Sequence, residues 1–116
     1  MMGNEIYNGA YSYNNLIMGN GIVNEGTGSV LLGNAVGSLG AANVAIGNVA
    51  VVGATTTSIA IGNFSAVGAG ATASIAMGNT AEVGAAAVGA IAIGNLALVD
   101  DEAVGSIAMG NNAQAM

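Results

Sequence analysis

Short apolar triplets recur along the chain, and each is followed directly by the dipeptide Gly-Asn. In most triplets the outer two residues are large and the middle one is Ala, an alternation typical of a strand whose side chains point to opposite faces. Gly and Asn favour turns. The pattern therefore predicts repeated short strands, each closed by a turn. The triplets are Leu16-Ile17-Met18, Val30-Leu31-Leu32, Val44-Ala45-Ile46, Ile59-Ala60-Ile61, Ile75-Ala76-Met77, Ile91-Ala92-Ile93 and Ile107-Ala108-Met109.

The Gly-Asn pair marks a repeat of nearly constant length. Its Gly stands at positions 3, 19, 33, 47, 62, 78, 94 and 110, so successive copies lie 16, 14, 14, 15, 16, 16 and 16 residues apart. A second alternating segment, such as Ser65-Ala66-Val67, follows each pair and ends near a Gly, or at Asp100 in the seventh copy. Each repeat therefore predicts strand, turn, strand, turn. The length varies in the second turn, where insertions are tolerated.

Stacked repeats predict an all-β fold, a parallel β-roll or β-solenoid of about seven to eight coils with 14–16 residues each. We expect residues 1–116 to form a single repeat domain, in which segment 1–15 is atypical. One repeat cannot bury its own large apolar face, whereas strands stacked about 4.8 Å apart can. The predicted structural core of the repeat is Ile17, Leu31, Val44, Ile46, Ile59, Ile61, Ile75, Met77, Ile91, Ile93, Ile107 and Met109.

The Gly-Asn pairs are the predicted turn residues. Both residue types are expected to accept a positive φ with little strain. Equivalent asparagines are also expected to hydrogen-bond to one another along the stack. We interpret them as structural rather than as a ligand site. The predicted turn residues are Gly19, Asn20, Gly33, Asn34, Gly47, Asn48, Gly62, Asn63, Gly78, Asn79, Gly94, Asn95, Gly110 and Asn111.

A single thin rod would leave much apolar surface in water, so the sequence predicts a homo-oligomer. Two arrangements of the Ile/Met side chains agree with the pattern. They line the interior of the roll, or they form the interface between chains. Met18, Met77 and Met109 occupy the same repeat position as Ile46, Ile61 and Ile93, which favours packing over a metal or redox role.

Composition excludes several classes of function. The chain has no Lys, Arg, His, Cys or Pro. Zinc and other nitrogen- or sulfur-ligated metal sites therefore lack ligands, and nucleic acid lacks a cationic partner. General acid–base catalysis would have only scattered carboxylates. We therefore predict no enzyme activity, no catalytic residue, no cofactor and no metal. The charged side chains are Glu5, Glu25, Glu82, Asp100, Asp101 and Glu102.

Membrane insertion is also not expected. A transmembrane helix needs roughly 20 consecutive apolar residues, and Asn or Gly interrupts every apolar stretch sooner. The first residues, Met1–Glu5, show neither the basic region nor the long apolar region of a secretory signal.

The segments Ser58-Ile59-Ala60-Ile61-Gly62-Asn63, then Ala66-Val67-Gly68, and Ser74-Ile75-Ala76-Met77-Gly78-Asn79 resemble the head repeat of YadA-like trimeric autotransporter adhesins. The resemblance covers about residues 16–115. It implies a left-handed parallel β-roll, a homotrimer, an extracellular or cell-surface location, and binding to a host or matrix surface.

Two other functions remain open. The chain starts and ends in mid-repeat, which is compatible with head-to-tail stacking into a filament and equally with a segment of a longer protein. Similar repeats also occur in phage tail fibres, so a tail-fibre segment is a further alternative.

Two smaller clusters have competing interpretations. Asp100-Asp101-Glu102 is either a solvated turn, which we favour, or a Ca²⁺ site. Tyr7, Tyr11 and Tyr13 form either a docking surface or a lid over the first coil.

Overall fold

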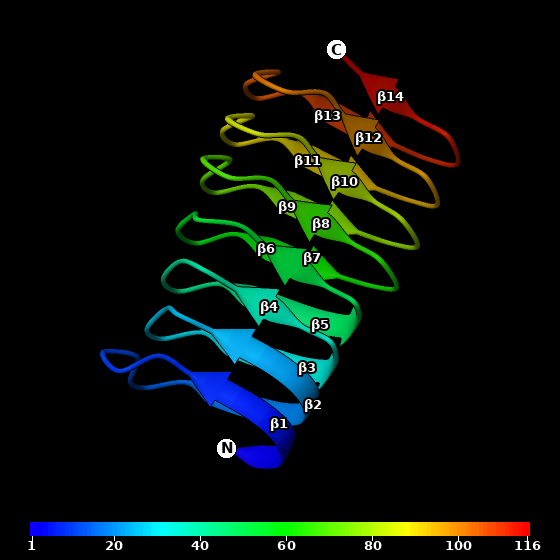
Figure 1. The fold of residues 1–116 in the computed structure, drawn as a ribbon. Helices are drawn as coiled ribbons and strands as arrows, with labels where there is room; N and C mark the ends of the chain where they lie inside the picture. Colours follow the sequence, from blue (N-terminus) through cyan, green and yellow to red (C-terminus); the bar gives the residue numbers. More distant parts are fainter.

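The computed structural model describes all residues, Met1–Met116, and confirms the predicted all-β fold. Fourteen strands without a helix form a parallel β-solenoid of about seven turns (Figure 1). The two termini lie at opposite ends of the stack. The strands are β1 (Met2–Asn8), β2 (Leu16–Asn24), β3 (Val30–Asn34), β4 (Gly37–Ser38), β5 (Val44–Asn48), β6 (Val51–Val52), β7 (Ile59–Ile61), β8 (Ala66–Val67), β9 (Ile75–Met77), β10 (Glu82–Val83), β11 (Ile91–Ile93), β12 (Leu98–Val99), β13 (Ile107–Met109) and β14 (Gln114–Ala115).

Each coil contributes one strand to each of two walls. The triplet wall contains the first residues of β2 and then β3, β5, β7, β9, β11 and β13, which carry the apolar triplets. The second wall contains the last residues of β2 and then β4, β6, β8, β10, β12 and β14. The long strand β2 turns the corner and pairs with β3 on one wall and β4 on the other. Every pair is parallel, so equivalent residues stack in columns.

The structure decides which side of each triplet faces inward. The middle residue is buried in all seven triplets, as Ile17 and Leu31 in the first two and as Ala in the other five. Its neighbours point outward because side chains alternate along a strand. Of the twelve predicted core residues, only Ile17 and Leu31 therefore lie inside the roll. The other ten lie on the outer surface: Val44, Ile46, Ile59, Ile61, Ile75, Met77, Ile91, Ile93, Ile107 and Met109.

The physical reason is the narrow interior. In the coils from β5 onward, the second wall fills it with Val52, Val67, Val83 and Val99, all almost completely buried. Only a small side chain fits opposite each Val without overpacking, and Ala supplies it. The sequence left two arrangements of the Ile/Met side chains open. The structure excludes the one in which they line the interior of the roll.

The Gly-Asn pair lies within β2, ends β3 and β5, and directly follows each triplet-wall strand from β7 onward, where it begins the turn to the second wall. Gly62 has a φ of 138°, and a Cβ at this position would overlap with the carbonyl oxygen of Gly78 in the next coil. Gly is therefore required by its conformation and by the close approach of two coils. Asn does not adopt the expected positive φ, because the second positive φ belongs to the residue after it, such as Phe64 at 57°. From β7 onward Asn still lies in the turn, as predicted.

The predicted asparagine ladder is confirmed. From Asn20 to Asn111, each Nδ2 group donates to the Oδ1 atom of the asparagine in the following coil, over distances of 2.8–3.3 Å. These six hydrogen bonds run along one exposed corner of the stack and hold neighbouring coils in register.

Buried polar side chains join the coils on the inside. In the N-terminal half, Asn43 Nδ2 donates to Ser38 Oγ at 3.1 Å and to the Thr55 carbonyl oxygen at 3.2 Å, while its Oδ1 accepts from the Ser58 N–H at 2.9 Å. This one amide contacts its own coil and the next. It therefore satisfies backbone groups that would otherwise be buried without partners.

In the C-terminal half the same column holds Ser74. Its Oγ donates to the Ala87 carbonyl oxygen at 2.8 Å and accepts from the Ala90 N–H at 2.9 Å. The small Ser therefore repeats, with fewer bonds, the coil-joining role of Asn43.

Candidate interaction surface

The outward residues of the triplet wall form one continuous apolar surface. Parallel register places Ile75 between Ile59 and Ile91 in one column, and Met77 between Ile61 and Ile93 in the other. Two columns of large side chains therefore run the length of the wall. We call this surface the aliphatic face. It consists of Leu16, Met18, Val30, Leu32, Val44, Ile46, Ile59, Ile61, Ile75, Met77, Ile91, Ile93, Ile107 and Met109.

No side chain of the same chain covers the aliphatic face. Its residues are half-buried by their neighbours in the middle of the stack and more exposed toward its ends, where Leu16 is 50% and Met109 65% exposed. Apolar surface in water costs about 25 cal/mol per Å², and extended patches of this kind mark interaction sites. The predicted Met positions belong to this surface, so they pack outside the roll.

The outer surface of the second wall has a different composition. Its column contains Val23, Val51, Ala66, Glu82 and Leu98, so a charge and small residues interrupt it. The two outer surfaces are therefore unequal, and only the triplet wall carries an uninterrupted run of large aliphatic side chains.

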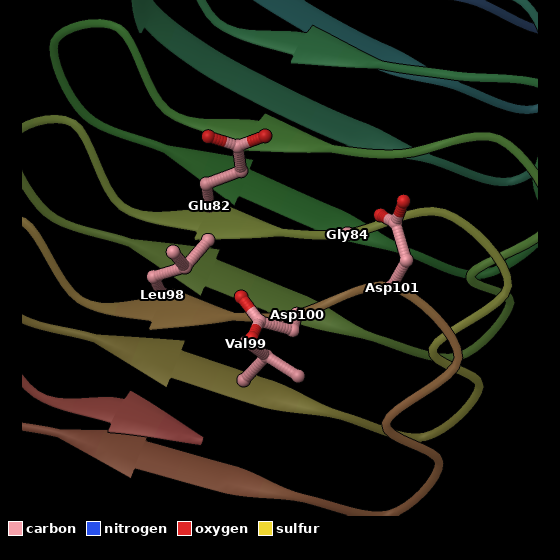
Figure 2. Close-up of a pocket in the computed structure, with 6 residues that line it drawn as sticks. All are labelled: Glu82, Gly84, Leu98, Val99, Asp100 and Asp101. Carbon is pink, nitrogen blue, oxygen red and sulfur yellow. The ribbon is translucent and has the colours of Figure 1, made fainter. Parts of the chain in front are cut away.

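Carboxylates gather at one place on the second wall, where an open recess of about 430 Å³ lies beside β10 and β12 (Figure 2). Asp101 Oδ1 accepts a hydrogen bond from the Ala85 N–H at 2.8 Å. This contact ties two coils together and agrees with the predicted turn at residues 100–102. No group of three or more His, Cys, Asp or Glu side chains is arranged to hold a metal ion. The recess is lined by Glu82, Gly84, Leu98, Val99, Asp100 and Asp101.

The three tyrosines lie at the N-terminal end with their rings largely in solvent. Tyr7 is 56%, Tyr11 91% and Tyr13 66% exposed. Tyr7 belongs to β1, and the other two belong to the loop between β1 and β2. Rings this exposed do not close the first coil, so the lid interpretation is wrong. Docking through these side chains stays a prediction.

Sequence reasoning missed one set of surface residues. The residue after each Gly-Asn adopts a left-handed conformation, and in three coils it is a large apolar residue: Val49, Phe64 and Leu96. The only sequence signal was that this position of the repeat varies freely. Nothing in the residue types indicated a positive φ, because none of the three favours it.

Comparison with known protein families, with curated proteins and with solved structures finds no match to this chain. None of its secondary structure is a helix long and apolar enough to cross a lipid bilayer.

Proposed function

We propose that this chain is a non-enzymatic module of an extracellular structural or adhesive fibre, and that copies of it associate through the aliphatic face. The observation that carries the proposal is the division of each triplet. From β5 onward each triplet buries a small Ala and leaves its two large aliphatic residues outside, the reverse of what an isolated domain needs. A second chain would bury those residues and supply the missing stabilisation.

The surface location and the trimer rest on the resemblance of the repeat to YadA-like heads. The parallel solenoid with about 16 residues per coil is consistent with that resemblance. In this proposal three parallel rods present the aliphatic faces to one another. The second walls and the exposed tyrosines face outward, where a host or matrix surface would be met.

A charge on the aliphatic face tests the association. Ile91 lies one coil from the C-terminal end of the face and is half-buried, and Leu98 is a similar half-buried residue on the outer surface of the second wall. We expect Ile91→Lys to leave monomers at concentrations where wild type forms oligomers, because a lysine is costly to bury in an apolar interface. Leu98→Lys is the matched control and should assemble like wild type.

The readout is the mass of the particles by sedimentation at several concentrations, with electron microscopy of the same samples. Particles of three chains support the adhesin-like trimer, and long even fibres favour the filament alternative. A wild-type chain that stays monomeric and folded at every concentration would refute the proposal.

A further inference from the structure

The corner between the two walls presents apolar side chains from strained backbone. Val49, Phe64 and Leu96 have φ values of 57–58°, in a region that is unfavourable for residues other than Gly and Asn. The equivalent position is Gly21 in an early coil and Asn112 in the last, so unstrained residues are compatible with the turn. The same turn also holds Glu5, Ala35 and Thr80 in this conformation, so the stacked backbone imposes it, and what remains to be explained is the choice of a large apolar side chain at an exposed corner.

These residues also gain little from their own chain. Phe64 is 53% and Leu96 47% exposed. Their backbone N–H groups stack in register, since Phe64 N–H donates to the Asn48 carbonyl oxygen and Leu96 N–H to that of Asn79, both at 2.9 Å. The three side chains therefore lie in one column along the corner, separated from the aliphatic face by the Gly-Asn pairs and their asparagine ladder. We call this column the corner strip.

The aliphatic face alone is narrow for a stable interface. Strands of three residues are ~10 Å wide, and seven coils are ~34 Å tall, which gives a projected area of ~340 Å². A stable interface usually buries about 800 Å² per partner. Including the turn, with its asparagine ladder and the corner strip, roughly doubles the width of the surface available to a partner. An interface that continues around the corner therefore comes close to the required area.

Charge and spacing identify the kind of partner. No residue from 26 to 81 is charged, so neither surface attracts an ionic partner in this stretch. The outward side chains form ridges repeated at the coil spacing of about 4.8 Å, and another rod of identical spacing offers grooves that match them along its whole length. A copy of this chain has both the same spacing and the same uncharged surface.

From these observations we infer that the corner strip is a second part of the contact between copies of this chain, in addition to the aliphatic face. The inference rests on the proposed self-association. It adds that a neighbouring copy covers Phe64 and Leu96, and that their apolar side chains, rather than the shape of the turn, are what the assembly needs.

Substitution by Asn tests the effect of the apolar side chain separately from the effect of the turn conformation. Phe64→Asn with Leu96→Asn removes both apolar groups and installs the residue that Asn112 provides naturally, so folding is expected to be kept. Thr80→Asn is the matched control at the same position of the intervening coil, where the side chain is exposed and polar. Sedimentation gives the dissociation constant of each, and circular dichroism checks the fold. Phe64→Gly with Leu96→Gly replaces the double variant if it does not fold.

The double variant is expected to dissociate at least about tenfold more readily than wild type, and Thr80→Asn to stay within about twofold. Association of the double variant that equals wild type overturns the inference and leaves the proposed function standing. Equal weakening by Thr80→Asn also overturns it, because the effect would then come from the turn. A monomeric wild type instead refutes the proposed function itself.

Discussion

In the first coils large side chains point inward from the triplet wall and small polar ones from the second wall, whereas from β5 onward the sizes are reversed. Ile17 and Leu31 are buried in the coils that also bury Asn24 and Ser38. In the later coils Ala takes the first position and Val the second, as in Ala60 and Val67. In each pair the residues are seven positions apart and belong to the two walls of one coil.

This difference shows that the side chains filling a coil are fixed neither in type nor in total size. The inward pair becomes smaller along the chain, from Ile17 with Asn24 through Leu31 with Ser38 to Ala with Val, and each pair fills the space between the walls of its own coil. The outward positions, in contrast, vary little in kind. They carry large aliphatic residues in both halves, so their selection does not depend on how the interior is filled.

The polar network gives the largest expected difference between the halves. Asn43→Ala removes two donated hydrogen bonds and leaves the buried Ser58 N–H without its acceptor. We expect it to lower the free energy of unfolding by about 3 kcal/mol, because unpaired buried groups keep their desolvation cost. Ser74→Ala in the same column of the C-terminal half removes one donated hydrogen bond and leaves the buried Ala90 N–H without its acceptor, so it should cost less, about 2 kcal/mol.

Denaturant unfolding at one fixed chain concentration measures both variants, since association makes stability depend on concentration. Equal losses for the two variants would mean that the halves use this column in the same way, and the comparison would fail.

The volume argument is tested next by exchanging sizes within one coil. Ala76→Leu is expected to destabilise by about 2 kcal/mol through overpacking, and Val83→Ala by about 2 kcal/mol through a cavity. Together they restore the summed volume, so the double variant should lose at least 1 kcal/mol less than the sum of the single losses. Additive losses would contradict pairwise filling of the coil.

Val52→Ala is the control for this comparison of the single and double variants. It is the same substitution in the same column, two coils or about 10 Å from Val83. Its loss should simply add to that of Ala76→Leu, because distant sites do not share a cavity.

Much of the fold was predictable because the same sequence pattern recurs in several copies. The period, the two strands in each coil, the location of the insertions and the asparagine ladder all followed from residues that recur in phase. The inward side of the triplet was not predictable, because alternation places Ile59 and Ile61 on one face without saying which face is inside. That choice depends on the distance between the walls, which no single repeat encodes.

The candidate surface was also predictable only in part. Its aliphatic columns were visible in the sequence as large residues, although they were taken for the core of the repeat. The corner strip was hidden, because a left-handed φ at Phe64 or Leu96 contradicts the local preference of both residues. Only the stacked backbone, which imposes the same turn on every coil, determines that conformation.

The smallest expected effect is a gain, and it comes from the one buried side chain that the repeat does not satisfy. Ser65 is completely buried, and its Oγ is the single buried side-chain polar atom without a hydrogen-bond partner. Ala50 and Ala81 occupy the equivalent position in the neighbouring coils. Ser65→Ala should therefore raise the free energy of unfolding by about 1 kcal/mol, because it removes an uncompensated desolvation cost.

Ser74→Ala is the control, because it removes a paired hydroxyl from the same half and must lower the free energy of unfolding. The opposite signs of the two changes in denaturant unfolding are therefore what the experiment tests. A loss of stability in Ser65→Ala would mean that the hydroxyl finds a partner in the protein in solution, and would place a polar contact in a column whose other buried members include Val36, Ala50, Ala81 and Ala97.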